Sequence, residues 1–370
     1  MDLRSQVTNL FSFVDDPRVQ GRVKHELKDI LFIALCTVLA NGEDYEDMVE
    51  FARQREAWLR QIIDLDNGIP SHDTFNRVFQ LIDPEQFSQC LGEDARLLIG
   101  QFKDQLIQFD GKKLRGHDPT SRGNAGLYLL NAWVSEHQLC IGQVEVGKKT
   151  NEIKAIPELI ERLDLTGATV SIDAIGCQAD IAQQLIKKEA DYILSVKGNQ
   201  KALLEQCQES FKIHQHQTHE ISWSYDHGRY ETRRAFIVSA SGMFSPELAD
   251  KWVGAGTIIR LESERTLNGV TSCETRYYIS SHTTKTPEWF NTAIRAHWSI
   301  ENQLHWHLDV SFAEDASRAR RGFAAQNLSI LRKLAINRIK QMQTKLSLKK
   351  RRFRASLNFD YLLEVLLLDF

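Results

Sequence analysis

The hydrophobic and polar positions of this chain change their spacing twice. Over residues 1–100, apolar residues recur at intervals of three and four, the spacing of amphipathic helices. From about residue 103, short runs rich in β-branched and aromatic residues alternate with helical segments. The predicted strands are 105–110, 127–134, 139–146, 168–173, 191–196, 220–225, 233–238, 257–262 and 274–280, and the predicted helices among them are 152–163, 179–189 and one from about 199.

The order of these elements predicts an α/β protein built in three parts. In the middle part, three strands in succession are followed by alternating helices and strands, which fits an RNase H-like mixed sheet and departs from a doubly wound sheet. The short N-terminal helices suit a helix-turn-helix-like module or a plain helical cap. We expect an all-helical N-terminal domain over 1–100, a catalytic core over 101–315 with a β subdomain inserted at about 217–284, and basic C-terminal helices over 316–370.

Composition is that of an ordinary soluble protein. The chain has 370 residues, of which 42% are hydrophobic and 26% charged. Its N-terminus is polar, and its longest apolar run, residues 30–40, has about half the length of a membrane span. The six cysteines are scattered without a CxxC pair, so we expect them to be reduced and mostly buried. We therefore expect a cytoplasmic protein with no membrane partner.

Charge is distributed unevenly along the chain. The net charge is −3, but residues 315–354 contain thirteen Lys and Arg and a single Asp, a balance of +12 that leaves −15 for the remainder. Such asymmetry predicts a basic surface for a polyanion. A solvated helical tail without a partner is the alternative.

Two aspartates stand at the ends of predicted apolar strands. Asp110 ends the run 105–110 and precedes Gly111, a residue that lets the backbone turn and a ligand approach closely. Asp173 ends the run 168–173 and is followed by small residues. A strand-end aspartate by itself often only caps a turn. Two in one sheet, with basic residues nearby, favour a binding role.

Glu301 stands in a predicted amphipathic helix. His297, Glu301 and His305 follow one another at steps of four, which places them on one helix face. Apolar residues occur on several sides of this helix, so we expect it to be largely buried. A buried carboxylate costs free energy unless it is paired or binds a metal ion.

These three carboxylates predict a site for two divalent metal ions. All-oxygen ligands suit Mg²⁺ or Mn²⁺ better than Zn²⁺. Two such ions, bridged by Asp110, can cut and join phosphodiester bonds. His297 and His305 lie roughly 12 Å apart along the helix, too far to share one zinc ion easily. Glu301 is favoured as the third ligand, and its rivals are Asp309, Glu314 and Asp315.

At these residues the chain resembles the DDE transposases, and specifically the H-repeat-associated transposase-like proteins. The resemblance covers nearly the whole chain. It implies an RNase H-like core, two-metal phosphoryl transfer, cut-and-paste transposition of double-stranded DNA, and a homodimer that pairs two DNA ends. The matching segments are residues 16–18, 67–79, 109–112, 171–178, 192–200, 297–306, 308–310 and 314–315.

The chain departs from related transposases around the third acid. These often place Tyr seven residues before the glutamate, Arg four before and Lys seven after, where this chain has Ile294, His297 and Leu308. Arg295 and His297 are candidates to substitute. The residues expected to support the acids are Lys112, His297, Asn302 and His305. The expected DNA contacts are Lys113, Arg115, Lys197, Arg295, Arg318, Arg320, Arg321, Lys349, Lys350, Arg351 and Arg352.

Three functions follow as hypotheses. The first is an active transposase that cleaves DNA and transfers strands. The second is a domesticated, catalytically silent DNA-binding protein, and the third is a metal-dependent nuclease without strand transfer. The three intact acids argue against simple decay of the metal site.

Overall fold

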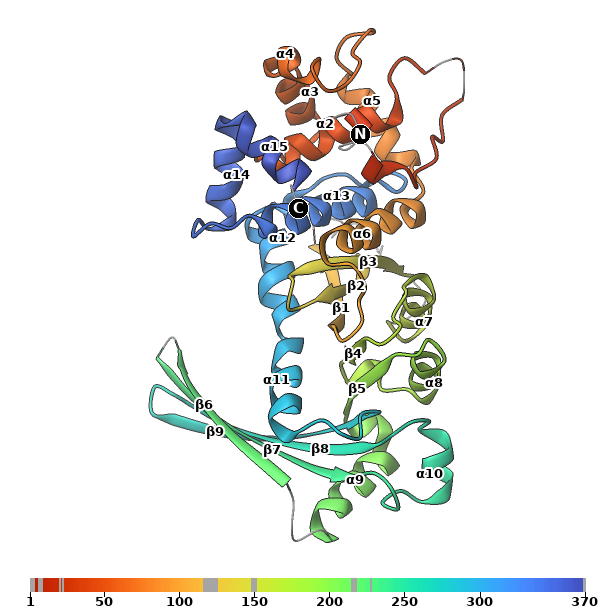
Figure 1. Cartoon of the computed structure of the whole chain (residues 1–370), viewed down its shortest axis with the longest axis vertical. Helices are drawn as coiled ribbons and strands as arrows, with labels where there is room; N and C mark the ends of the chain where they lie inside the picture. Colours follow the sequence, from red (N-terminus) through yellow and green to blue (C-terminus); the bar gives the residue numbers. More distant parts are fainter. Residues whose placement is uncertain are drawn as a thin grey trace.

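The computed structural model describes residues 4–5, 9–19, 21, 23–115, 126–147, 152–213, 218–226 and 228–368. Figure 1 shows an elongated molecule with helices from both ends of the chain gathered at one end, strands β1–β5 in the middle, and a ribbon of strands β6–β9 at the other end. The helix α11 (Pro287–His297) runs along the long axis between the ribbon and the helical end.

The N-terminal helices begin at side chains that accept backbone hydrogen bonds. Asp44 accepts from the amides of Glu46 and Asp47, Ser71 accepts from Thr74, and Asp83 accepts from Glu85. These elements are η1 (Asn9–Phe11), α2 (Leu27–Leu39), α3 (Tyr45–Gln54), α4 (Glu56–Leu59), α5 (His72–Leu81) and α6 (Pro84–Ile99).

A nine-stranded mixed sheet forms the centre of an α/β fold. The strand order is β3-β2-β1-β4-β5-β9-β8-β7-β6, in which only the β1–β4 and β4–β5 pairs are parallel. The predicted early strands and helices are confirmed, with ends shifted by a few residues. They are β1 (Leu106–Leu114), β2 (Leu127–Val134), β3 (Leu139–Val146), α7 (Glu152–Arg162), β4 (Thr169–Ile172), η3 (Ala174–Gly176), α8 (Ala179–Lys187), β5 (Asp191–Val196), η4 (Gly198–Gln200) and α9 (Lys201–Ile213).

The later strands extend this sheet. β9 pairs antiparallel with β5, with Leu194 opposite Ile279, so the inserted residues continue the central sheet instead of forming one of their own. Residues 217 and 227 of the predicted insertion lie outside the described residues. The elements of this region are β6 (Thr218–Asp226), β7 (Arg229–Ser239), α10 (Pro246–Lys251), β8 (Thr257–Leu267) and β9 (Val270–Ser280).

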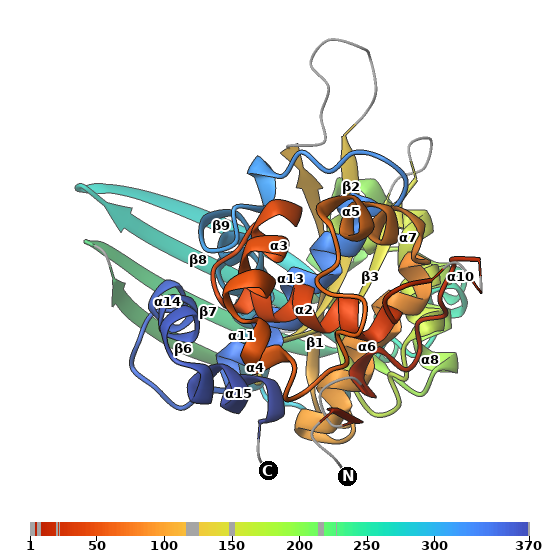
Figure 2. The same cartoon turned by 90° about the horizontal axis from the view of Figure 1, so that it is seen from above.

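The C-terminal helices share a hydrophobic core with the N-terminal helices. Leu331, Leu334 and Ile336 of α13 pack in one cluster with residues of α2, α5 and α6. Figure 2 shows α13 running beneath α2 and α3, near the middle of the molecule. After α11 the elements are a π-helical turn η5 (Glu301–His305), α12 (Trp306–Val310), η6 (Glu314–Ala316), α13 (Ala324–Gln341), α14 (Leu348–Leu357) and α15 (Phe359–Leu367).

Part of the C-terminal positive charge lies inside the protein. Arg338 is buried and donates a hydrogen bond of 2.6 Å to Asp94, whose carboxylate is also buried. Arg332 and Lys333 are buried in α13, and Arg352 is only 1% exposed. The excess of positive charge in the sequence therefore overstates the positive charge at the surface.

The described part of the chain contains no helix that is both long enough and apolar enough to span a membrane. All six cysteines are free, and all but Cys273 are buried. Burial raises the pKa of the Cys90 thiol to about 12, which keeps this thiol protonated and unreactive at neutral pH.

Candidate active site

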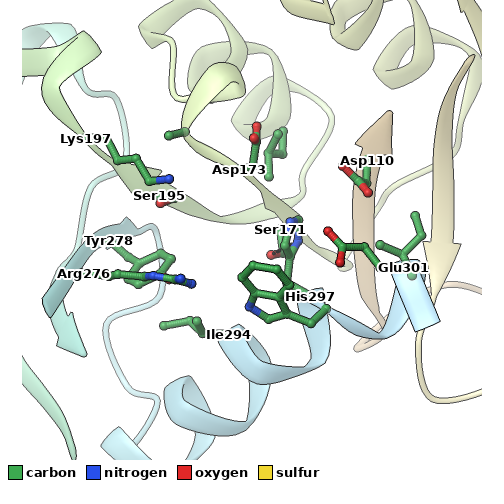
Figure 3. Close-up of a pocket in the computed structure, with 14 residues that line it drawn as sticks. Asp110, Ser171, Asp173, Ser195, Lys197, Arg276, Tyr278, Ile294, His297 and Glu301 are labelled. Atoms are coloured by element: carbon green, nitrogen blue, oxygen red, sulfur yellow. Dashed lines mark hydrogen bonds between the residues drawn. The ribbon is translucent and has the colours of Figure 1, made fainter. Parts of the chain in front are cut away.

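Asp110, Asp173 and Glu301 line one pocket (Figure 3). Asp173 follows the last residue of β4, at the edge where the parallel pairing of β1 with β4 ends. The prediction that Asp110 ends its strand was wrong, because β1 stays paired with β2 past Asp110 as far as Leu114. Phe109 pairs with Ile172, so the residue that follows each of them stands at the same level of the sheet. Glu301 reaches the pocket from the helical segment opposite this edge. The three acids that the sequence predicts to act together are therefore neighbours.

Asp173 also has the plainer role that the sequence allowed. Its Oδ1 accepts a hydrogen bond of 3.0 Å from the Ile175 amide and caps the short helix η3. The side chain is exposed. Capping uses one carboxylate oxygen and leaves the second oxygen available at the pocket.

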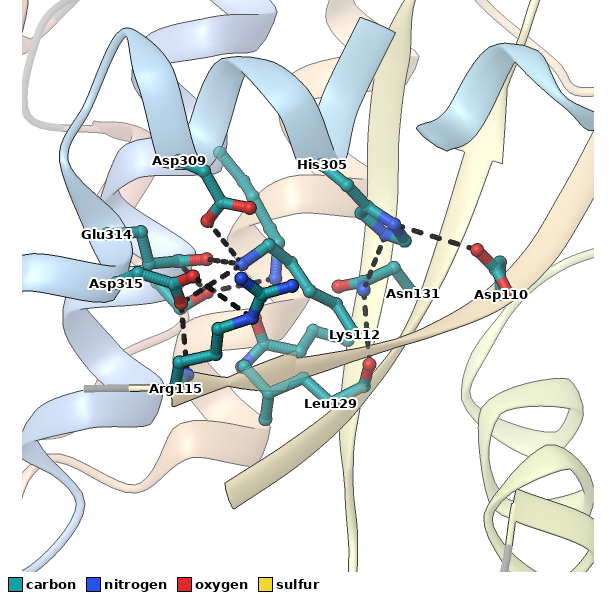
Figure 4. A network of polar contacts seen from close by, with 12 residues as sticks. Asp110, Lys112, Arg115, Leu129, Asn131, His305, Asp309, Glu314 and Asp315 are labelled. Carbon is teal, nitrogen blue, oxygen red and sulfur yellow. Dashed lines mark hydrogen bonds and ion pairs between the residues drawn. The ribbon is translucent and has the colours of Figure 1, made fainter. Parts of the chain in front are cut away.

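Asp110 lies in a strongly negative environment. Burial, together with the charges of Glu301, Glu152 and Asp173, raises the pKa of its carboxyl to about 7, although the hydrogen bond from the Gly111 amide opposes this increase. Nδ1 of His305 lies 3.6 Å from Oδ2 of Asp110 (Figure 4).

Glu152 is a member of this cluster that the sequence did not reveal. It opens α7, and a Cβ atom placed on Gly111 would lie only 2.2 Å from its Oε1. Burial and the charge of Asp173 raise the pKa of Glu152. An acid in the first turn of a helix normally indicates a favourable contact with the helix dipole, so its sequence position alone does not indicate a site.

The helix that carries Glu301 is more exposed than its sequence predicts. Only one face, with Ile300, Leu304 and Leu308, packs into the core, while Glu301 is exposed. Trp298 is 42% exposed, because the segment bridges the sheet and the ribbon and leaves one flank in solvent. The expectation of a largely buried helix was wrong. Its π-helical turn holds Glu301 and His305, and such turns often occur at functional sites.

Two histidines of the Glu301 segment make polar contacts near the acidic residues. Nδ1 of His297 lies 3.0 Å from the Ser171 hydroxyl at the floor of the pocket. Burial, together with the charges of Lys333 and Lys112, lowers the pKa of His305 to about 3. His305 is therefore neutral at physiological pH and contacts Asp110 on one side and the Asn131 amide, at 3.4 Å, on the other. Asn302 is exposed on the flank facing the ribbon.

Lys112 binds the three rivals of Glu301. Its Nζ lies 2.6 Å from Asp309, 3.1 Å from Glu314 and 3.7 Å from Asp315 (Figure 4). Burial by itself would raise the pKa of Glu314. The positive charges of Lys112, Lys333 and Arg332 outweigh burial and hold this pKa below its usual value. These carboxylates are occupied by a cation of the protein itself and do not line the pocket of the three acids.

The predicted DNA contacts are distributed over several regions. Lys197 lines the acidic pocket and Arg295 a groove next to it. Arg318, Arg320 and Arg321 are exposed around a separate cavity beside Tyr45. Arg115 pairs with Asp315 at 3.8 Å, and Lys113 lies over the Tyr128 ring.

The four predicted DNA contacts on α14 differ in exposure. Lys349 and Lys350 are exposed at the helical end of the molecule, far from the ribbon (Figure 1). Arg351 donates to carbonyl oxygens, including that of Thr344 at 2.7 Å. Arg352 is buried and donates to the Val38 carbonyl at 2.9 Å and 3.0 Å.

The pocket also includes residues that sequence reasoning missed. Ser195 of β5 and Arg276 and Tyr278 of β9 line it together with the acids. Ser195 pairs with Tyr278 because β9 adds to the sheet beside β5. No local signal in the sequence indicates that pairing, since about eighty residues separate the two strands.

As they stand, the acids do not converge on one point. Within the described residues, no three His, Cys, Asp or Glu side chains are close enough to hold a metal ion. In the same part of the chain, neither Asp173 nor Glu301 forms a salt bridge. The three carboxylates therefore line one pocket without meeting at a single point, and two of them form no salt bridge within the described residues.

The raised pKa of Asp110 gives a testable pH dependence of stability. Its proton binds more tightly in the folded than in the unfolded state, so the metal-free protein should become more stable as pH falls from about 7 towards 4. Asp110→Asn should make this increase smaller. Urea midpoints across this pH range, measured in a chelator, test it, and equal slopes for the two proteins would contradict it.

Comparison with known proteins identifies the family. A family model described as Transposase DDE domain matches residues 101–338, and one described as DDE_Tnp_1-associated matches residues 8–93. Putative transposase YncI of Escherichia coli O157:H7 is 38% identical over 373 residues, which cover 96% of this chain and 93% of the relative. The H repeat-associated putative transposase YhhI of Escherichia coli strain K12 is 36% identical over 379 residues, which cover 99% and 98%. The chain therefore belongs to the DDE transposase family.

Proposed function

We propose that this protein cleaves DNA at the ends of an insertion-sequence-type element and transfers the strands by two-metal-ion phosphoryl transfer. The single observation that carries the proposal is the meeting of Asp110, Asp173 and Glu301 at one pocket. Asp110 and Asp173 each directly follow the last residue that β1 and β4 pair with one another, and Glu301 lies on the facing helical segment. The antiparallel β1–β2–β3 strands followed by parallel β4 and β5 support an RNase H-like core for this chemistry.

The donor set fits Mg²⁺ or Mn²⁺. Asp110, Asp173 and Glu301 offer only oxygen atoms, and they repel one another because the pocket supplies no neutralising salt bridge to two of them. Two bound ions would supply activation of the attacking hydroxyl and stabilisation of the leaving oxygen. Holding them would require the carboxylates to rotate towards one another.

The remaining residues of the pocket position the acids and the DNA. Neutral His305 would orient the Asp110 carboxylate, and the Ser171–His297 contact would fix the helix against the sheet. Lys197, exposed at the rim, would contact a phosphate next to the scissile one. Lys112, bound to acidic residues, and the buried Arg352 would act within the protein instead of on DNA.

The larger organisation is also a proposal. We retain a helical N-terminal domain over residues 1–100, a catalytic core over 101–315 and C-terminal helices over 316–370, with the shared helical core joining the first and last parts. The exposed basic residues Arg318, Arg320, Arg321, Lys349 and Lys350 would contact double-stranded DNA away from the pocket. A homodimer would pair two DNA ends, as cut-and-paste transposition requires.

A nicking and strand-transfer assay tests the function. DNA carrying the gene's own flanks is incubated with Mg²⁺ or Mn²⁺ and with wild type, Asp173→Asn or Asp180→Asn. Asp180 is an exposed acid on α8 outside the pocket, so it serves as the matched control. We expect metal-dependent joining by wild type and the control, and none by Asp173→Asn.

The other outcomes distinguish the alternatives. Tight DNA binding without cleavage would overturn the proposal in favour of a domesticated, silent DNA-binding protein. Cleavage without joining would instead indicate a metal-dependent nuclease.

A further inference from the structure

A groove lined by arginines opens beside the pocket of the three acids. Its walls are the inner face of strands β7–β9 and the helical segment from α11 to η5. We call it the arginine groove, and its arginines are Arg229, Arg233, Arg265, Arg276 and Arg295.

The strand register explains why these arginines share a face. On β7, Arg229 and Arg233 are separated by an even number of residues, so their side chains point to the same side of the sheet. Arg265 on β8 pairs with Glu231, which lies between them. Arg276 follows on β9, and Arg295 faces the strands from α11, within 3.4 Å of the Ser224 hydroxyl on β6.

The groove carries an excess of positive charge. Its acidic residues are Glu231 and Glu274, so five arginines face two carboxylates. Glu231 lies between Arg229 at 3.7 Å and Arg265 at 3.8 Å, and Glu274 pairs with Arg276 at 2.7 Å. Arg233 is 6% exposed and donates to the Asn291 side chain at 2.9 Å without an acidic partner at that distance. Three positive charges therefore remain to be balanced by a ligand.

The groove is continuous with the pocket of the three acids. Arg276 and Trp298 line both. The Arg276 guanidinium lies 5.2 Å from the centre of the Trp298 ring, and the ring is 42% exposed. A half-exposed indole held by a cation at the junction of two hollows offers a flat surface on which a nucleic acid base can stack.

We propose that the arginine groove binds an unpaired DNA strand that continues from the scissile phosphate. This inference rests on the proposed function, because it places that phosphate at the three acids. The strand's phosphates contact the arginines, and one base stacks on Trp298. A row of arginines with an aromatic platform is the combination by which proteins bind single strands without reading their sequence.

Binding of tailed DNA tests the groove without any need for catalysis. The full-length protein is titrated, in a chelator, against a short fluorescent duplex that is blunt or carries an unpaired thymidine tail of about 10 nucleotides at either end. Wild type should bind one of the tailed duplexes at least about fivefold more tightly than the blunt one.

Two variants assign this gain to the groove. The first is the double variant Arg265→Gln with Arg295→Gln, in which Arg229 remains to pair with Glu231. It should remove the gain in affinity. The slope of log affinity against log salt concentration for tailed DNA should fall by about 1.4, roughly 0.7 per lost phosphate contact. Trp298→Leu should reduce the gain while leaving the salt slope nearly unchanged. Arg234→Gln with Lys251→Gln is the matched control, because Arg234 pairs with Glu264 on the opposite face of β7.

The outcomes separate the groove from the proposed function. A wild type without preference for tails, or a groove variant that keeps the full gain, overturns the groove proposal even if cleavage and joining are observed. A gain lost only in the groove variants supports it even if the protein does not cleave. Equal loss in the control variant overturns the assignment to this face of the ribbon.

Discussion

Glu301→Gln is expected to lose metal-dependent DNA cleavage by about a thousandfold or more. A bound metal supplies several kcal/mol of transition-state stabilisation, and each 1.4 kcal/mol is tenfold in rate. Gln keeps the size and hydrogen bonding of the side chain but removes the charge that holds a cation. Because Glu301 is exposed and forms no salt bridge within the described residues, the variant should fold normally and bind DNA nearly as well as wild type.

The choice between Glu301 and its rivals makes this experiment decisive for the site. Glu301 lines the pocket with the aspartates, whereas Asp309 and Glu314 lie around Lys112. Glu288→Gln is the matched control, since Glu288 is an exposed acid in the first turn of α11. Cleavage rates and DNA affinity measured side by side give the answer. Full cleavage by Glu301→Gln would move the third ligand to Asp309 or Glu314.

Local patterns predicted the strands that carry the aspartates because each strand is strongly apolar, and this signal lies within the segment itself. Both β1 and β4 are uninterrupted runs of buried or partly buried residues. β4 ends directly before Asp173 as predicted, whereas β1 continues past Asp110 to Leu114. Parallel pairing of β1 and β4 then places the two acids together. Glu301 approaches the aspartates because its helix crosses this edge of the sheet. The resemblance to DDE transposases predicted this approach, whereas the periodicity of the helix could not.

Non-local pairing explains most of what the sequence left out. Arg276 reaches the pocket only because β9 joins β5, and Glu152 reaches Asp110 only because Gly111 has no side chain. Neither contact leaves a mark on the pattern of apolar and polar residues around Arg276 or Glu152, so the sequence could not reveal it. Arg352 shows the opposite error, since a basic residue in a basic run was expected at the surface and instead binds backbone carbonyls inside the protein.

The exposure of the Glu301 helix also depends on how distant parts of the chain pack together. The apolar residues on several sides of this segment predict burial, but Trp298 and Trp306 remain half-exposed beside grooves and solvent. An aromatic ring that is not used for packing is available for binding, which is why Trp298 enters the proposed groove and why burial alone could not have identified it.

Lys112→Met is expected to lower the free energy of unfolding by about 3–5 kcal/mol, the usual cost of removing one partner of a buried ion pair. Lys112 is 7% exposed and Glu314 1% exposed, so solvent cannot replace the lost contact at 3.1 Å. Lys333 and Arg332 still lie near Glu314, which places the effect towards the lower end of this range. Lys187→Met, at an exposed position of α8, should change stability little.

The pH dependence gives this prediction a second, independent test. The pKa of Glu314 is lowered in the folded state, so the stability it contributes is present above the ordinary carboxyl value of 4.5 and is lost as pH falls through the folded value. When Glu314 is protonated, it no longer forms an ion pair with Lys112. The stability difference between wild type and Lys112→Met, taken from urea unfolding, should therefore become smaller in acid. A difference that stays constant would assign the effect to lost packing of the lysine stem.

Lys112 connects this network to the pocket, because it lies two positions after Asp110 on β1 and binds Asp309 on α12. Breaking the contact should therefore loosen the strand that carries Asp110 against the helical segment that carries Glu301. A double variant, Lys112→Met with Glu314→Gln, removes the unpaired buried charge and should recover part of the stability. If its stability returns while DNA cleavage stays low, Lys112 also positions the acids, and recovery of both together would limit its role to stability.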